Sequence, residues 1–129
     1  MSAQETEYQM SIIDDRVNTL MERRELRLEI AAKSTPRRDL IRKAIASSLK
    51  VPLERVFVRS TLSSFGTNIS ICKVNVYNDD VRGKSVEPNY IQMRNLSREE
   101  RKQALNAAAA AKAQAKPAAE EKKAAPKVK

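Results

Sequence analysis

Residues 55–79 read as a β-hairpin, because apolar and polar side chains alternate along two segments that a glycine-containing turn separates. A period of two places successive side chains on opposite faces of a strand, so one set is buried and the other turns outward. The predicted inward set is Val56, Val58, Leu62, Cys72, Val74 and Val76. The predicted outward set includes Arg55, Phe57, Arg59, Lys73, Asn75 and Tyr77. An outward face of cations and aromatic rings favours a surface for RNA over a catalytic cleft.

The composition supports a polyanionic partner. The chain has 129 residues and a formal net charge of +9, with 25 Lys or Arg against 16 Asp or Glu. A balance of this kind favours nucleic acid or an anionic membrane surface. The length predicts one small domain with an extension.

The residue types that catalysis and metal binding usually need are scarce. Histidine does not occur in the sequence, which removes the usual general base and the commonest nitrogen ligand. Only Gly66 and Gly83 are glycines, too few for a phosphate-binding loop. The adjacent acids Asp14–Asp15 and Asp79–Asp80 lie at segment ends, where acids are solvated or cap turns. We therefore predict that the chain is not an enzyme and binds no cofactor or metal.

Cysteine use and hydropathy bear on location. Cys72 is the only cysteine, so no internal disulfide can form, and a buried apolar function is expected for it. No signal peptide is recognisable, and no apolar run approaches the roughly 18 residues that would span a bilayer. A reducing cytoplasm is the expected compartment.

Two strands and a helix are predicted before the hairpin. Residues 8–13 suggest a short strand, residues 14–21 a connection or a single helical turn, and residues 22–31 a second strand with Leu26, Leu28 and Ile30 on one face. Thr35–Pro36 predicts a helix start, since Thr caps free N–H groups and Pro fits the first turn. The helix carries an apolar stripe and ends near Pro52. The stripe is Leu40, Ile41, Ala44, Ile45, Ser48 and Leu49.

The region after the hairpin is less regular. Residues 79–86 are compatible with a loop or a short helix. Residues 87–90 contain Pro88 and are expected to break regular structure, and residues 91–94 are expected to be a short extended piece.

The C-terminal part has a different character. Ser97 and Glu100 form a predicted capping box, followed by helix formers through Ala115 with no apolar stripe. After Lys116 the composition predicts disorder. Residues 96–129 hold nine basic and four acidic residues, which makes them denser in positive charge than the rest. The sequence thus predicts a flexible N-terminus (1–7), an α+β domain (8–95) and a basic helix with a tail (96–129).

The order strand, strand, helix, strand, strand predicts a small α+β plait, with a four-stranded, mainly antiparallel sheet under one main helix. Five collinear motifs between Met10 and Asn95 make the chain resemble the archaeal and eukaryotic family of small-ribosomal-subunit protein twenty-four, with the length and tail of an archaeal member. The motifs are Glu22–Leu26, Thr35–Asp39, Val51–Arg59, Phe65–Asn68 with Val76–Asp79, and Glu87–Tyr90 with Met93–Asn95.

The resemblance implies a structural constituent of the small ribosomal subunit that binds ribosomal RNA and neighbouring ribosomal proteins in the cytoplasm. It implies no membrane and no small-molecule substrate. Basic residues neutralise phosphates and release counterions, so they are the candidate contacts. The candidates are Arg23, Arg24, Arg37, Arg38, Arg55, Arg59, Lys73, Arg82, Lys84, Arg94, Arg98, Arg101 and Lys102.

Other interpretations stay open at this point. Phe57 and Tyr77 could stack on unpaired bases or pack against a second layer of the fold, and packing is preferred. A free-standing RNA-binding module outside the ribosome is one alternative function. A small phosphatase is another, in which Arg23 or Arg24 would hold an anion together with Asn68 or Asn75. A membrane-surface function for the Ala/Lys helix is disfavoured, because it has no face of large apolar residues.

Overall fold

The structure is a computed structural model that describes residues 8–123 of the chain. The predicted flexible N-terminus (residues 1–7) and the end of the tail (residues 124–129) lie outside the described residues. The chain divides into two units, residues 1–95 and residues 96–129.

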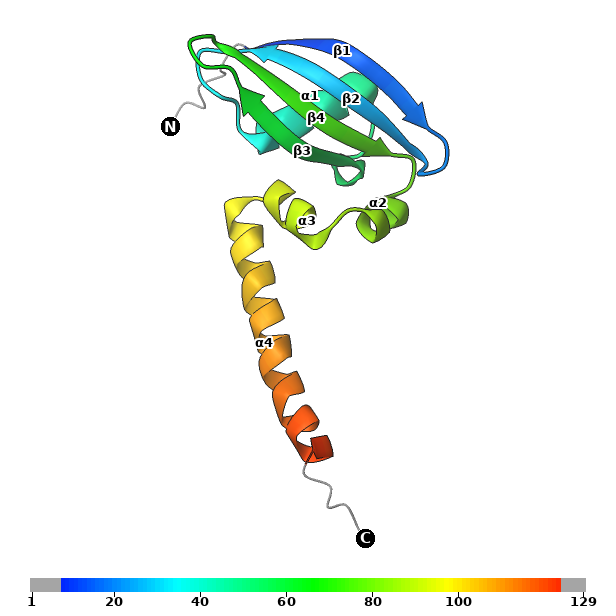
Figure 1. The fold of residues 1–129 in the computed structure, drawn as a ribbon, viewed down its shortest axis with the longest axis vertical. Helices are drawn as coiled ribbons and strands as arrows, with labels where there is room; N and C mark the ends of the chain where they lie inside the picture. The colour runs from blue at the N-terminus through cyan, green and yellow to red at the C-terminus, as the bar shows by residue number, and fades with distance from the viewer. Residues whose placement is uncertain (1–7, 124–129) are drawn as a thin grey trace. The chain divides into compact units, whose positions relative to one another are not determined.

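The first unit is built on a four-stranded antiparallel sheet (Figure 1). Its strands are β1 (Gln9–Asn18), β2 (Arg23–Ala31), β3 (Val56–Ser63) and β4 (Ile69–Tyr77). They lie in the order β1-β2-β4-β3, so β1 and β3 form the two edges. Helix α1 (Arg38–Leu49) covers one face. The predicted α+β fold with one main helix on an antiparallel sheet is confirmed.

The face of the sheet under α1, here called the inner face, carries the main apolar core. Leu28 and Ile30 of β2, Val74 of β4 and Val58 of β3 are at most 1% exposed. Ile45 of α1 is also 1% exposed and belongs to the same cluster. Burial of each such side chain contributes about 1.5–3 kcal/mol, so this layer supplies much of the stability of the unit.

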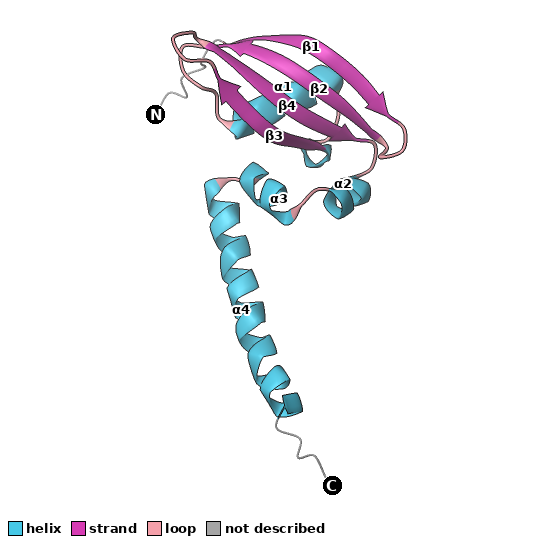
Figure 2. Ribbon diagram, viewed as in Figure 1, coloured by secondary structure: helices cyan, strands magenta, loops and turns pink. Residues whose placement is uncertain are grey.

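The opposite face, here called the outer face, is partly covered by two short helices that follow β4 (Figure 2). Helix α2 spans Asp80–Val86 and helix α3 spans Asn89–Asn95, and a short 3-10 turn, η1 (Leu53–Arg55), precedes β3. Phe57 and Tyr77 of the outer face form a second small core with Ile91 of α3. Residues 79–86 were compatible with either a loop or a short helix, and the structure shows a helix at residues 80–86.

The first strand is longer than predicted. We expected it to end at Ile13, but β1 continues to Asn18 after a β-bulge between Ile12 and Asp14. A bulge inserts one extra residue and reverses the alternation of side chains, so the period of two is lost at that point. The paired positions Asp14–Arg27 and Arg16–Glu25 show that the strand continues past the bulge.

A second bulge corrects the prediction for Leu62. Between Val58 and Ser60 the register shifts, so Arg59 and Ser60 together oppose Lys73. Thr61 then takes the position opposite Cys72, and Leu62 turns to the outer face, where it is 61% exposed. The predicted inward positions Cys72, Val74 and Val76 are buried as expected.

Helix α1 begins later than predicted. Its N-cap is Arg37, with extended backbone and no capping side chain, rather than Thr35. The Thr35 hydroxyl instead lies 2.9 Å from the Ser63 hydroxyl of β3. Within the predicted apolar stripe, Ile41 and Ile45 are the buried residues of this helix.

Residues 91–94 are helical, which corrects the predicted extended piece. The Pro88 carbonyl accepts hydrogen bonds from the Ile91 and Gln92 N–H groups at 3.0 and 3.2 Å, starting the first turn of α3. Ile91 and Asn95 are four residues apart, share one helical face and are 3% and 2% exposed. The Asn95 amide donates to the Val58 carbonyl and accepts from the Val58 N–H, at 3.2 and 3.0 Å. The Asn95 side chain thus pairs with backbone groups at the free edge of β3, as a neighbouring strand would.

The second unit contains helix α4 (Arg98–Lys123). The predicted capping box is confirmed, since the Ser97 N–H donates to Glu100 Oε2 at 3.1 Å and the Glu100 N–H donates to Ser97 Oγ at 3.3 Å. The predicted disorder after Lys116 is wrong for residues 117–123, which continue the helix through Pro117. Ala, Glu and Lys on both sides of the proline are strong helix formers. The disorder prediction, which was based on composition, did not take this helix propensity into account.

Candidate nucleic-acid interface

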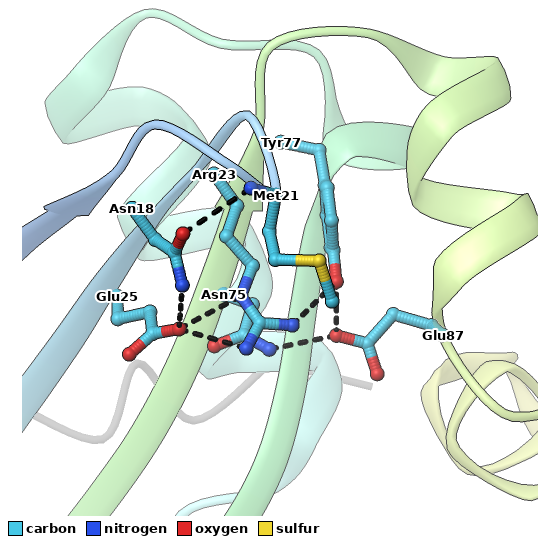
Figure 3. Close-up of polar contacts among 7 residues, drawn as sticks. All are labelled: Asn18, Met21, Arg23, Glu25, Asn75, Tyr77 and Glu87. Carbon is cyan, nitrogen blue, oxygen red and sulfur yellow. Dashed lines mark hydrogen bonds and ion pairs between the residues drawn. The ribbon is translucent and has the colours of Figure 1, made fainter.

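The thirteen predicted contacts fall into groups that differ in how firmly the protein itself holds each cation. Arg23 of β2 is largely enclosed, with 15% of its side chain exposed. Its guanidinium lies 2.7 Å from Glu25 and donates to the Tyr77 hydroxyl at 3.0 Å (Figure 3). Arg23 therefore has a structural function on the outer face.

The Arg23 interaction belongs to a larger polar network that fixes the α2–α3 segment to the sheet. The Tyr77 hydroxyl and the Asn75 amide both donate to Glu87 Oε1 at 2.7 Å, and Glu87 is 4% exposed between the two helices (Figure 3). The hydrogen bond from Arg23, reinforced by one from Asn18, holds the pKa of the Glu25 carboxyl below its usual value despite partial burial. Burial raises the pKa of the Tyr77 hydroxyl, which keeps it a donor.

Several other predicted cations form ion pairs on the surface. Arg55 Nε donates to Asp80 at 2.7 Å, which ties η1 to α2. Arg24 binds Asp15 through two nitrogens, on the inner side of the sheet, and lowers the pKa of that carboxyl. Weaker pairs, at 3.6 to 4.0 Å, join Lys84 to Glu54, Arg37 to Asp39 and Arg82 to Glu22. Such exposed pairs contribute about 0–1 kcal/mol each, so these cations remain available to an RNA phosphate.

Three predicted cations gather around one cleft on the outer face. Arg59 of β3, Lys73 of β4 and Arg94 of α3 line a cavity of about 240 Å³, together with Ser60, Tyr90 and Ile91. All three cationic residues are exposed. The bulge in β3 places Arg59 and Ser60 together opposite Lys73, so the local irregularity builds one wall of the cleft.

Helix α3 supplies the other wall of this cleft. Tyr90 and Arg94 are four residues apart and share the helical face next to that of the buried Ile91 and Asn95. Tyr90 is 57% exposed, and the Arg94 guanidinium carbon lies 5.3 Å from the centroid of its ring. We name the site formed by Arg59, Lys73, Tyr90 and Arg94 the α3 cleft.

A second hollow lies on the other side of Arg59 and Lys73 and has a different charge balance. Its volume is about 330 Å³. Acids and cations are mixed in its lining of Asp14, Arg16, Glu25, Leu26, Arg27, Arg59, Lys73 and Asn75. Arg16 and Arg27 are cations of the outer face that the sequence interpretation did not include. The alternation in residues 23–31 could have indicated Arg27, whereas Arg16 became recognisable only with the extended β1.

The remaining predicted cations are placed as follows. Arg38 lies in the first turn of α1, and its buried Nε has no hydrogen-bond acceptor among the described residues. Arg98, Arg101 and Lys102 are exposed in the first two turns of α4. Arg42, which no sequence feature distinguishes from the other helix cations, donates to the carbonyls of Leu53, Val56 and Asn95 at 2.5 to 2.9 Å.

The two aromatic residues of the predicted outward face are buried. Phe57 and Tyr77 are 5% and 1% exposed, and their rings meet edge to face with centroids 5.7 Å apart. The preferred interpretation, packing against a second layer, is confirmed. Tyr90 was not predicted as a contact, because residues 91–94 were expected to be extended and its i, i+4 relation to Arg94 was not apparent.

Residues of the phosphatase hypothesis lie beside carboxylates in the described part of the chain. In residues 8–123 no group of three or more His, Cys, Asp and Glu residues could hold a metal ion, and no helix is long and apolar enough to cross a membrane. Arg23 and Asn75, two residues of the phosphatase hypothesis, share a network with the acids Glu25 and Glu87. Carboxylates at that position repel the anion that the hypothesis requires.

Comparison with known proteins connects this fold to one family. Residues 8–96 match the model of the family described as ribosomal protein S24e. The small ribosomal subunit protein eS24 of Pyrobaculum aerophilum is 39% identical over 94 residues, which cover 71% of this chain and 78% of that protein. The protein of the same name from Methanococcoides burtonii is 34% identical over 87 residues, covering 67% and 85%. Both relatives are archaeal and carry the names of ribosomal proteins.

Proposed function

Because this chain belongs to the ribosomal protein S24e family, we propose that it is a structural constituent of the small ribosomal subunit and binds ribosomal RNA through its basic surface. The family is one of ribosomal proteins without catalytic activity, which sets the phosphatase hypothesis aside. The observation that carries the RNA-binding part is the α3 cleft, where exposed cations from three elements meet. The partners are ribosomal RNA and neighbouring ribosomal proteins, and the location is the ribosome in the cytoplasm.

The proposed RNA contacts follow from how each cation is held. Arg59, Lys73 and Arg94 come first, because they are exposed and converge on one site. Cations in partly exposed surface ion pairs come second, since such pairs contribute only about 0–1 kcal/mol and a phosphate can replace the carboxylate at little cost. This second group is Arg24, Arg37, Arg55, Arg82 and Lys84. Arg23 comes last, because Glu25 and Tyr77 already occupy its donors.

The basic helix of the second unit is proposed to add further RNA contacts. Arg98, Arg101 and Lys102 lie within two turns of α4, which has no apolar stripe with which to form a core. A positively charged helix of this type is suited to RNA phosphates or to an acidic patch of a neighbouring protein. Arg38, at the first turn of α1, completes the set of proposed contacts.

Sedimentation of a tagged full-length chain in lysate tests the proposal. The chain should migrate with the small subunit and leave it as salt rises, because each neutralised phosphate adds to the salt dependence of binding. Replacing Arg59, Lys73 and Arg94 together by Gln should release the chain at lower salt. Migration of the unaltered chain at the top of the gradient, away from subunits, would contradict the proposal and favour a free-standing RNA-binding module.

A further inference from the structure

The α3 cleft combines two features that RNA backbone binding alone does not need. It has cations for a phosphate and, in the same lining, the exposed aromatic ring of Tyr90 on α3. Phe57 and Tyr77 already fill the apolar space under α2 and α3, so Tyr90 is not required for that core. An exposed ring next to converging cations calls for a ligand that has both a charge and a flat apolar face.

The charge distribution distinguishes this cleft from the neighbouring hollow. The α3 cleft is lined by three cations and no acid among the described residues, whereas Asp14 and Glu25 contribute to the other hollow. Glu25 does act on Arg59 electrostatically, but its nearest cation is Arg23, at 2.7 Å. An anion is therefore better stabilised on the α3 side of Arg59 and Lys73 than on the β1 side.

We propose that the α3 cleft holds one unpaired nucleotide of the RNA, with its phosphate between Arg59 and Lys73 and its base against Tyr90. This inference rests on the proposed function and specifies the kind of RNA element that the site receives. In a duplex the base faces are stacked on one another and cannot reach a side chain, whereas a base in a loop, bulge or end can be splayed out onto an aromatic ring.

Arg94 prepares Tyr90 for this contact. Its guanidinium lies over the ring, 5.3 Å from the centroid, which favours an ordered ring and adds a positive charge beside the base. Arg94 and Tyr90 are spaced by one helical turn on a helix that Asn95 fixes to the edge of β3 through two hydrogen bonds. The ring is thus held by a rigid element, which reduces the entropy lost on binding.

An acidic segment of a neighbouring protein is the competing ligand. It would satisfy Arg59 and Lys73 equally well, but it offers no flat surface to Tyr90. The exposed ring is the observation that favours a nucleotide, and it also separates the two ligands in an experiment.

The test is a fluorescence titration of the full-length chain with two RNA probes, a ten-nucleotide single strand of adenosines and a blunt ten-base-pair duplex. Tyr90→Leu keeps an apolar side chain but removes the ring, and it should weaken single-strand binding on the order of tenfold while leaving duplex binding unchanged. Tyr90→Phe should restore single-strand binding. Because Tyr90 is exposed, both variants should keep the melting temperature of the unaltered chain.

Variants of the cations provide a second, independent test of the same site. Arg59→Gln and Lys73→Gln should each reduce the slope of log affinity against log salt by about 0.7 for the single strand. Arg27→Gln is the matched control, because Arg27 is an exposed cation of the same outer face that lies across from Asp14. It should change the slope less than either cleft variant does.

The outcomes separate this inference from the proposed function. Equal single-strand affinity for the unaltered chain and Tyr90→Leu, with normal sedimentation on the small subunit, overturns the nucleotide site and leaves the proposed function intact. If the unaltered chain binds neither probe and does not sediment with the small subunit, both the nucleotide site and the proposed function are overturned. Displacement of the single strand by a ten-residue glutamate peptide at lower concentration than by unlabelled RNA would show that the cleft prefers an acidic protein segment, which also overturns the nucleotide site.

Discussion

The two faces of the sheet follow the same alternation of side chains, but one is a packed apolar core and the other is polar and partly open. The inner face packs Leu28, Ile30 and Val74 under a single helix, and its interactions are non-directional. The outer face is closed at one end by hydrogen bonds to Glu87 and remains open around Arg59 and Lys73. Stability and recognition can therefore be assigned to opposite sides of one small sheet.

The largest loss of stability is expected from a cavity on the inner face. Leu28→Ala removes a side chain that is 1% exposed and should lower the free energy of unfolding by about 2–5 kcal/mol. Urea unfolding followed by circular dichroism measures the loss. Leu62→Ala on the outer face is the matched control, since Leu62 is 61% exposed and its loss should cost no more than about 0.5 kcal/mol. Equal costs at the two positions would mean that the outer face contributes an apolar core of its own.

The next largest effect is expected where α2 meets the outer face. A Cβ atom on Gly83 would lie 2.8 Å from Phe57 Cε2, so Gly83→Ala forces the ring or the helix to move. Overpacking of this kind costs about 1–3 kcal/mol. Ser85→Ala, on an exposed position of the same helix, should leave the melting temperature nearly unchanged. A neutral Gly83→Ala would show that α2 is not held firmly against the sheet.

The inner face was predictable from the sequence because it depends on periodicity and apolarity alone. Leu26, Leu28 and Ile30, together with Cys72, Val74 and Val76, all lie where alternation places them. What periodicity could not show is where a strand gains a residue. The bulges near Ile13 and Arg59 have no composition signal, and each reverses the faces of all residues beyond it.

The candidate site was predictable in its cations but not in its assembly. Arg59, Lys73 and Arg94 were all expected contacts, yet the cleft exists only because the bulge and α3 bring them together. Tyr90 was overlooked because Pro88 suggested a break, whereas its carbonyl in fact receives the first hydrogen bonds of α3. The use of Arg23 as a structural donor required knowledge of Tyr77 in a strand 54 positions away.

A smaller effect, confined to polar groups, is expected from acid. Arg24 depresses the pKa of Asp15 and Arg23 depresses that of Glu25, through hydrogen bonds made in the folded state. A carboxyl whose pKa is lower when folded stabilises the protein above its unfolded pKa, near 4, and loses this contribution as pH falls through the folded value. Melting temperature should therefore be flat from pH 7 to about pH 5 and decline below about pH 4.

The acid effect can be assigned by a matched pair of variants. Glu25→Gln should reduce the decline below about pH 4, because it removes the carboxyl whose pKa Arg23 lowers. Glu54→Gln removes a carboxyl that is 65% exposed, beside Lys84, and should leave the profile unchanged. Since these side chains are partly exposed, each contribution should stay below about 1 kcal/mol. An identical profile for all three proteins would show that Glu25 does not stabilise the outer face.

The smallest effect on stability is expected from deletion of the C-terminal segment, which should affect RNA binding more than folding. Helix α4 presents exposed side chains over most of residues 98–115 and belongs to a unit separate from residues 1–95. Deleting residues 117–129 should therefore change the free energy of unfolding by no more than about 0.5 kcal/mol, as expected for surface changes away from the core. The same deletion removes four lysines and two glutamates, a net charge of +2, and should weaken RNA binding most at low salt. A large fall in melting temperature would mean that the segment packs on the first unit, so that stability is not confined to the inner face.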